Sequence, residues 1–545
     1  MQLIQKKRTK PKRRRRLIVL MAVALLAAYI CAACLPYRAQ PEPSEKTVRA
    51  FSVEDFYGQA SDDLPKTDAL ISADHEESTP DRARILADNG EALAERVRLI
   101  SHARERIALS TFDFRTDNSG KIMLAALMEA AGRGVEVCVL IDGFSFFAHG
   151  LGDPYFAAFA QTDNVTLKIY NPVNLLKPHK LMGRLHDKYL IADDTAYILG
   201  GRNTFDYFLG DDTDYINYDW DVLVTSGGET SSLQQVAAYF ETIWALPDCR
   251  EGGASVPFWK KNQVSRSLDE LDALAQELHT THADWFDEVD YEAQTVPADK
   301  ITLISNPIHT GVKEPVVFYQ ITELMRQAGG EVFFHTPYIL CSDWMQERLG
   351  EVCTKNESVH MMTNSVANNG NPFGATDYYL HRDELLSTGV QILEYDSGVS
   401  YHGKCFTIGD RISGVGSFNW DMRSAYLDTE LMLVIDSAEL NAQLRSHMER
   451  YEREALRIVT LTEDPDTADN RAVSQTVTDN RTDSQDVSDT HTPMSNQTEG
   501  TGHQAAASTW TYEYPAGHTP RELTTARRIS IRLLGIFDKA FRFLL

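Results

Sequence analysis

Two short polar motifs, at matching positions in the two halves of the chain, constrain the fold most strongly. His186 and Lys188 form one His-x-Lys motif, and His402 and Lys404 form the other. An asparagine in a glycine-containing segment follows each histidine at the same distance of 17 residues, at Asn203 and Asn419. One His-x-Lys motif is a weak signal because it arises readily by chance. Two copies with identical spacing predict two related lobes.

The segments around both motifs alternate between helical and strand patterns. In the first half, a helical pattern at 91–106 precedes a strand pattern at 107–112, and a helix at 121–132 precedes a strand at 135–141. The second half repeats this order. Such alternation predicts an α/β fold with a largely parallel sheet covered by helices.

The chain has 545 residues, too many for one ordinary core. We expect a basic segment at 1–16, an apolar transmembrane anchor or signal at 17–35, a spacer at 36–90, lobe 1 at 91–250, a polar spacer at 251–300, lobe 2 at 301–461, a disordered tether at 462–518 and a basic amphipathic helix at 519–545.

The charge of the chain is distributed unevenly. The net charge is -25, from 53 Lys and Arg against 78 Asp and Glu, which argues against binding to the phosphate backbone of a nucleic acid. Residues 1–16 nevertheless hold nine basic side chains and no acid. Residues 519–545 carry a net charge of +4. The cations therefore gather at both ends of the chain.

Residues 17–35 carry no charge and are long enough to cross a hydrocarbon layer of ~30 Å as a helix. The basic residues before them predict a cytoplasmic start, with residues 36–545 outside the cytosol. Two alternatives are a cleaved secretory signal and a lipoprotein signal in which Cys34 is lipidated. The seven cysteines have no metal-site or disulfide-framework spacing.

The last segment has apolar residues that could share one helical face, among them Ile529, Leu533 and Ile536. Such a basic amphipathic helix suits an anionic membrane surface, and the preceding tether would let it reach one. The alternative is a helix that docks back on the protein.

The paired motifs resemble those of the phospholipase D superfamily over residues 91–461. The segments 200–203 and 416–424 are most similar to the bacterial cardiolipin synthase branch. The resemblance implies two α/β/α lobes related by a pseudo-two-fold axis, with one shared active site.

The residue types suit attack on a phosphodiester. Lys188 and Lys404 would neutralise its charge, and the side chains of Asn203, Ser417 and Asn419 would bind the phosphate. A neutral imidazole can attack phosphorus, and a second can protonate the leaving alkoxide. By resemblance, His186 is the nucleophile that forms a phosphohistidine and His402 is the general acid, although the reverse assignment is open.

The resemblance also implies supporting carboxylates. Asp221 and Glu430 would orient the two histidines, unless they are solvated acids at the starts of strands. Asp193 completes the first motif. In the second motif Gly409 stands where an aspartate is expected, so either the next residue, Asp410, takes its place or the aspartate is a dispensable support. We expect no metal and no cofactor.

We therefore expect a phosphatidyltransferase of the bacterial cell membrane that forms cardiolipin from phosphatidylglycerol, with its catalytic part extracytoplasmic. The alternatives are a hydrolytic phospholipase D that releases phosphatidic acid, a nuclease or other phosphodiesterase, and an inactive membrane scaffold. The expected partners are a phospholipid substrate and the membrane, with no nucleic acid and no predicted oligomeric state.

Overall fold

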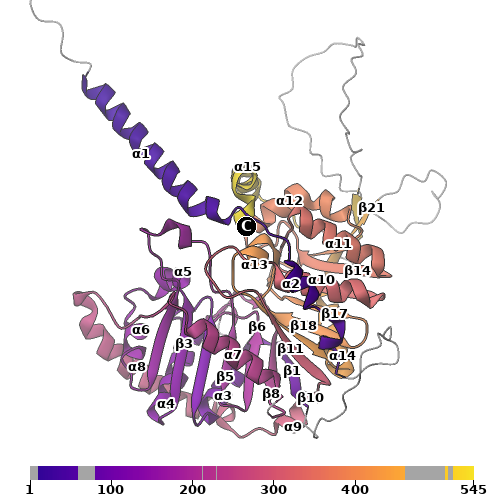
Figure 1. Ribbon diagram of the computed structural model, residues 1–545. Coiled ribbons are helices and arrows are strands. Elements are labelled where there is room, and N and C mark those ends of the chain that lie inside the picture. The colour runs from indigo at the N-terminus through magenta and orange to yellow at the C-terminus, as the bar shows by residue number, and fades with distance from the viewer. Residues whose placement is uncertain (1–9, 59–79, 212, 229, 461–509, 514–519) are drawn as a thin grey trace, which may run out of the picture.

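The computed structural model describes residues 10–58, 80–211, 213–228, 230–460, 510–513 and 520–545. They form two α/β lobes, each built on a nine-stranded sheet (Figure 1). In lobe 1 the strand order is β10 (Val296–Pro297), β1 (Arg82–Leu86), β8 (Asp221–Thr225), β6 (Ala196–Gly200), β5 (Tyr189–Ala192), β2 (Arg106–Thr111), β3 (Glu136–Asp142), β4 (Val165–Tyr170) and β9 (Cys249–Glu251).

Lobe 2 repeats this arrangement. Its strand order is β11 (Lys300–Ser305), β20 (Leu431–Asp436), β18 (Ile412–Gly416), β17 (Cys405–Ile408), β12 (Glu331–His335), β14 (Ser358–Asn364), β15 (Gln391–Tyr395), β21 (Ala455–Thr460) and β22 (Trp510–Glu513). The series β8-β6-β5-β2-β3-β4 corresponds to β20-β18-β17-β12-β14-β15. The predicted α/β fold with two related lobes is confirmed.

The prediction of largely parallel sheets is wrong. Only β2, β3 and β4 pair in parallel in the first sheet, and β12, β14 and β15 in the second. The strands that follow the two motifs instead form hairpins, β5 with β6 and β17 with β18. Short turns can join only antiparallel neighbours, because a parallel pair needs a long crossover.

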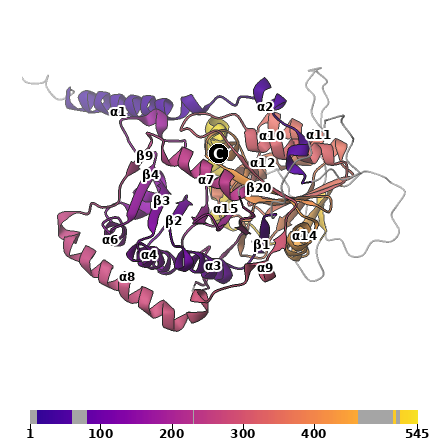
Figure 2. The same ribbon diagram turned by 60° about the horizontal axis from the view of Figure 1, so that its bottom comes forward.

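Helices cover both faces of each sheet (Figures 1 and 2). The outer helices of lobe 1 are α3 (Asn89–His102), α4 (Asn118–Gly132), α6 (Pro154–Phe159) and α8 (Lys261–Thr281). Those of lobe 2 are α10 (Val316–Ala328), α11 (Asp343–Lys355) and α12 (Pro372–Leu386). Between the lobes lie α7 (Ser232–Trp244) and α14 (Ala438–Glu452). The short helices are α2 (Glu45–Arg49), α5 (Gly143–Ser145), α9 (Tyr291–Gln294) and α13 (Met422–Tyr426).

The two lobes share one buried core. Side chains alternate across a strand, so Leu109 and Val139 pack on the outer helices while Leu140 faces inward. The inner cluster also contains Val415 and Leu433 of lobe 2. Separating the lobes would expose this apolar surface to water, so the lobes hold a fixed relation to each other.

The described part of the chain begins with α1 (Lys10–Cys34), which projects from the body (Figure 1). The stretch Ile18–Tyr37 is long and apolar enough to cross a membrane, with a mean hydropathy of 2.7. Its end packs on the body. The Tyr37 hydroxyl donates to the backbone oxygens of His179 and Thr310, at 2.8 and 3.0 Å.

The structure corrects parts of the expected segment plan. β1 lies inside the segment 36–90, where we expected a spacer, and pairs with β8 along its whole length. In the segment 251–300, α8 packs on α4 and α6, and β10 pairs with β1. In the segment 462–518, β22 pairs with β21, and the other residues of that tether lie outside the described residues. Neither polarity nor proline content shows which short apolar runs will complete a sheet edge.

We predict that Leu86→Ala destabilises the protein by about 2–5 kcal/mol, because Leu86 is fully buried in the core of lobe 1. Urea unfolding of the purified protein measures this change. Leu176→Ala is the matched control, since Leu176 is 92% exposed. Equal stability of the two variants would mean that β1 is not part of the folded core.

Candidate functional site

The two His-x-Lys motifs meet between the lobes. His186 and Lys188 lie on the segment that leads into β5. His402 and Lys404 lie between β16 (Ser400–Tyr401) and β17. Each lysine is 1% exposed, while the His186 and His402 side chains retain 13% and 21% of their exposure. The histidines are therefore within reach of a ligand, and the lysines lie beneath them.

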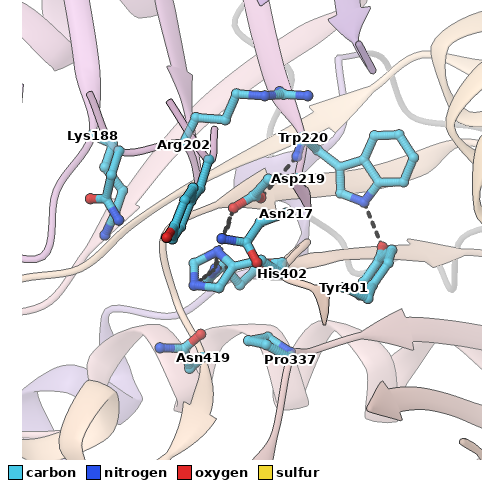
Figure 3. Close-up of polar contacts among 12 residues, drawn as sticks. Lys188, Arg202, Asn217, Asp219, Trp220, Pro337, Tyr401, His402 and Asn419 are labelled. Atoms are coloured by element: carbon cyan, nitrogen blue, oxygen red, sulfur yellow. Dashed lines mark hydrogen bonds and ion pairs between the residues drawn. The ribbon is translucent and has the colours of Figure 1, made fainter. Parts of the chain in front are cut away.

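Each histidine is held by a carboxylate of the other lobe. His186 Nδ1 lies 2.8 Å from Glu430 Oε1, and His402 Nδ1 lies 2.6 Å from Asp219 Oδ2. Figure 3 shows Asp219 directed at the His402 ring. With Nδ1 engaged in both rings, Nε2 is the nitrogen that can face a substrate.

The backbone supports this exchange at equivalent places. Leu185, before the first histidine, forms a parallel bridge with Thr429, before Glu430. Tyr401, before the second histidine, pairs in the same way with Tyr218 of β7 (Asn217–Tyr218), before Asp219. The two histidine–carboxylate pairs thus occupy symmetric positions.

Burial sets the protonation of the site. Burial, with the Lys188 ammonium nearby, lowers the pKa of His186 well below its usual value. Burial and Lys404 lower the pKa of His402 to about 4. Burial also lowers the pKa of Lys188 to about 7, against the opposing effect of Glu430, and lowers the pKa of Lys404. Both imidazoles are therefore neutral near pH 7.

The two carboxylates differ in charge. Burial alone would raise the pKa of Asp219, but the Lys404 ammonium at 3.5 Å and His402 outweigh it, so this pKa is lowered. Burial raises the pKa of Glu430 to about 8 despite Lys188. Glu430 is instead held by hydroxyl donors, Ser417 Oγ at 2.5 Å and Ser424 Oγ at 2.6 Å.

The structure revises the expected role of Ser417. Its hydroxyl contacts Glu430 and accepts the backbone N–H of Leu431, so it positions the carboxylate instead of facing a phosphate. The equivalent residue of lobe 1 is Gly201, where a side chain would collide with Asp219. Ser424 also donates a hydrogen bond to Glu430 and so helps to position it. The sequence placed Ser424 in a segment similar to the family but assigned it no role.

The two asparagines lie beside the motifs. Asn203 Oδ1 accepts the backbone N–H of Asp113 at 3.2 Å. Asn419 Nδ2 lies 3.3 Å from the Tyr338 hydroxyl, and its Oδ1 is buried without a hydrogen-bond partner among the described residues. Figure 3 shows Asn419 and Lys188 on different sides of His402. An unpaired amide oxygen here is available to a hydroxyl of a ligand.

The prediction that Asp221 orients a histidine is wrong. Asp221 is fully buried and forms ion pairs with Arg96 at 2.8 Å and Arg202 at 3.2 Å. The sheet register explains the error. Asp221 pairs with Gly200 as Met432 pairs with Gly416, which makes Met432 the counterpart of Asp221.

Asp219 is therefore the counterpart of Glu430. The sequence concealed this because the loop from Gly200 to Asp219 is five residues longer than the loop from Gly416 to Glu430. The position of Asp219, two residues before β8, was a possible signal. Asp221 lies directly before the apolar residues of that strand and therefore appeared the better candidate.

The aspartate of the motif is a structural residue at the far end of β5. Asp193 accepts the backbone N–H groups of Arg104, Glu105 and Arg106, at 2.8–2.9 Å, and adopts a φ of 49°. Gly409 occupies the same turn in lobe 2, with a φ of 54°. The adjacent Asp410 is exposed, so it is not part of the site and does not replace the missing aspartate.

Aromatic side chains and a second polar layer support the site. The rings of Phe112 and Phe208 contact His186 and His402 edge-on, with centroids 5.4 and 4.8 Å apart. The Tyr401 hydroxyl accepts the Trp220 indole N–H at 2.6 Å and lies 2.7 Å from His335 Nδ1 (Figure 3). These contacts fix the backbone on both sides of His402 and Asp219.

Among the described residues, the side chains close enough together to hold a metal ion are Asp377 and His381 of α12 and Asp538 of α15 (Thr525–Phe541). They lie between these two helices. Arg542 pairs with Asp377 at 2.5 Å, so the cluster already contains a cation. The site between the lobes relies on lysine for positive charge.

We predict that Asp221→Asn costs about 3–5 kcal/mol of stability, because it leaves Arg96 and Arg202 buried without a carboxylate. Urea unfolding measures the loss, and the exposed Asp410→Asn is the control. Unchanged stability of Asp221→Asn would contradict a structural role for this carboxylate.

We predict that Gly409→Asp leaves turnover unchanged and costs at most about 1 kcal/mol of stability, because a Cβ there meets open space and aspartate tolerates positive φ better than most side chains. Asp193→Ala should lower the free energy of unfolding by about 1 kcal/mol, because three N–H groups lose their acceptor, two of them on the exposed residues Arg104 and Glu105. A large gain in turnover with Gly409→Asp would contradict a purely structural role for this position.

The chain was compared with known proteins. The family model described as "Cardiolipin synthase, PLD-like domain" matches residues 97–244 and 321–451, just over half of the chain. Cardiolipin synthase C of Escherichia coli is 25% identical over 386 residues, covering 64% of this chain and 79% of that protein. Cardiolipin synthase 1 of Staphylococcus aureus is 24% identical over 384 residues, covering 67% and 65%. An uncharacterized protein of Helicobacter pylori is 23% identical over 395 residues, covering 66% and 77%.

The crystal structure of a phosphatidylserine synthase from Haemophilus influenzae has the same fold, with a TM-score of 0.50 and 16% identity over 69% of this chain and 87% of that one. The family match spans both lobes and both His-x-Lys motifs. The chain therefore belongs to the cardiolipin synthase PLD-like family, a branch of the phospholipase D superfamily.

Proposed function

We propose that this protein is a phosphatidyltransferase that forms cardiolipin from two molecules of phosphatidylglycerol through a phosphohistidine. The exchanged histidine–carboxylate pairs carry this proposal, because they present two Nε2 atoms above two buried lysines in one site. Membership of the cardiolipin synthase family supports it. A site with one nucleophile and one proton donor suits a reaction in two displacements.

In the first displacement, His186 Nε2 attacks the phosphorus of phosphatidylglycerol. The bond from phosphorus to the glycerol headgroup oxygen breaks, and His402 gives its Nε2 proton to that oxygen. Glycerol leaves, and the phosphatidyl group stays on His186. In the second displacement, a hydroxyl of another phosphatidylglycerol gives its proton to His402 and attacks phosphorus, and the phosphorus–nitrogen bond breaks. The product is cardiolipin, and His402 is protonated again.

The resting electrostatics fit these roles. The attacking imidazole must be neutral, and the lowered pKa of His186 keeps it so. The donor must bind a proton, which a pKa of about 4 disfavours before the substrate binds. A bound phosphodiester places negative charge beside His402 and engages Lys404, whose Nζ lies 3.3 Å from His402 Nε2. Both effects raise the pKa of His402, so substrate binding favours the protonated imidazolium that acts as the general acid.

The position of the protein at the membrane follows from α1. The stretch Ile18–Tyr37 would anchor it, and the basic residues before this stretch would keep that end in the cytoplasm. The catalytic lobes would then lie outside the cytosol. Burial of Cys34 and Tyr37 against the lobes favours a retained anchor over cleavage or lipidation at Cys34.

We predict that expression in a bacterial host lacking cardiolipin restores it, and that His186→Ala and His402→Ala both abolish it. Lipid extraction and mass spectrometry measure the product, and Asp410→Asn is the control that retains synthesis. Phosphatidic acid without cardiolipin would indicate a hydrolase with water as acceptor. Equal cardiolipin in wild type and in the histidine variants would refute the mechanism.

We predict that Asp219→Asn lowers turnover by about 10²-fold or more, because His402 loses the carboxylate that orients it. Purified protein with phosphatidylglycerol in mixed micelles provides the measurement. In the His402→Ala variant, acid-labile phosphate trapped on His186 from a phosphatidyl ester whose leaving group needs no protonation would support the assigned roles. The same adduct found on His402 in a His186→Ala variant would reverse them.

A further inference from the structure

We propose that α15 is a second membrane-contact element, which lays its exposed face on the bilayer surface beside α1. The occupant is the lipid bilayer that holds α1, at a surface containing anionic phospholipids. This inference rests on the membrane location given under the proposed function but is independent of the transfer chemistry. We expected a tethered membrane helix, with a helix docked on the protein as the alternative, and the structure shows the docked helix. Docking leaves its outer face open to a membrane.

The inner side of α15 is fixed to lobe 2. Ile531 and Asp538 are buried against the lobe, and α15 packs along α12. Asp538 lies 3.5 Å from His381, and Arg542, just after the helix, pairs with Asp377. The contacts with lobe 2 therefore set the position of α15.

The outer side of α15 is apolar and exposed. Ile529, Leu533 and Ile536 retain 53%, 64% and 71% of their exposure. Their spacing of four and three residues places them on one stripe of the helix. Arg528, Arg532 and Lys539 are also exposed. A large apolar stripe flanked by cations is unfavourable in water and complements an anionic lipid surface.

The end of α15 lies at the level where α1 leaves the membrane. Leu35, Arg38 and Gln40, at and after the end of the apolar span, line a pocket of about 450 Å³ together with Lys539, Phe541 and Phe543. Figure 1 shows α15 beside the base of α1. Because the span ends at Tyr37, a bilayer that contains α1 has its surface at this pocket, adjacent to α15.

A second exposed apolar point lies near α1. Leu175 and Leu176 are 65% and 92% exposed, in the loop before the turn Pro178–Lys180. That turn contacts α1, and Tyr37 bonds to His179 within it. Together, this loop and α15 would restrict rotation of the lobes about the axis of α1, which a single membrane helix would allow.

The contact would also place the active site. The chain ends against α13, where the backbone N–H of Arg423 donates to the Leu545 oxygen at 2.9 Å. The next residue, Ser424, holds Glu430, the partner of His186. Docking of α15 would therefore keep the histidines at a fixed distance from the lipid surface.

Depth-dependent fluorescence quenching tests the contact. The full-length protein is reconstituted in vesicles of phosphatidylglycerol and phosphatidylethanolamine, with and without lipids brominated on their acyl chains. Ile536→Trp should add tryptophan emission that the bromines quench. Leu268→Trp is the matched control, because Leu268 is a 38% exposed apolar residue of α8. Figure 2 shows α8 on the opposite side of lobe 1 from α1. Equal lack of quenching at both positions would overturn the proposal.

A paired activity measurement separates this inference from the proposed function. The double variant Leu533→Asp and Ile536→Asp should lose at least ~5-fold in turnover of phosphatidylglycerol in vesicles. It should keep wild-type turnover of soluble short-chain phosphatidylglycerol, which also shows that the variant folds. Full turnover on vesicles would overturn the membrane contact. If the wild type lacks transferase activity, the proposed function fails, while the quenching result still decides the role of α15.

Discussion

The exchange of carboxylates between the lobes is the interaction on which the rest of the site depends. Glu430 of lobe 2 holds His186 of lobe 1, and Asp219 of lobe 1 holds His402 of lobe 2. Neither lobe can orient its own histidine, so the site exists only when both lobes are folded and packed. The shared core of α7, α14 and the two sheets supplies that packing, because it makes separation of the lobes costly.

The two histidine–carboxylate pairs occupy equivalent positions in the two lobes, but their carboxylates have different surroundings. Asp219 keeps its charge beside Lys404, while Glu430 is held by two serine hydroxyls and has a raised pKa. Burial raises the pKa of Glu430, and the hydrogen bonds from Ser417 and Ser424 oppose this only in part. In lobe 1 the equivalent of Ser417 is Gly201, which leaves no room for a side chain against Asp219. Two related half-sites can thus take different parts in one reaction.

Much of the site could be predicted from the sequence, because its strongest signal is local. His186, Lys188, His402 and Lys404 each lie two residues from their motif partner, and the lobes repeat them at one spacing. The histidine partners depend on register instead. Loops of different length separate Gly200 from Asp219 and Gly416 from Glu430, so only the paired strands show which acid corresponds to which.

The two α/β lobes, the paired motifs and the apolar first helix follow from periodicity and spacing within short segments, so the sequence predicts them. Only the folded chain shows that Asp219 and not Asp221 holds His402, that Asp193 and Gly409 form turns, and that β1 joins the sheet of lobe 1. It also shows that α15 docks on lobe 2 with its apolar face outward. Each of these outcomes joins residues far apart in the chain, and their pairing is fixed by packing and register, which no short segment encodes.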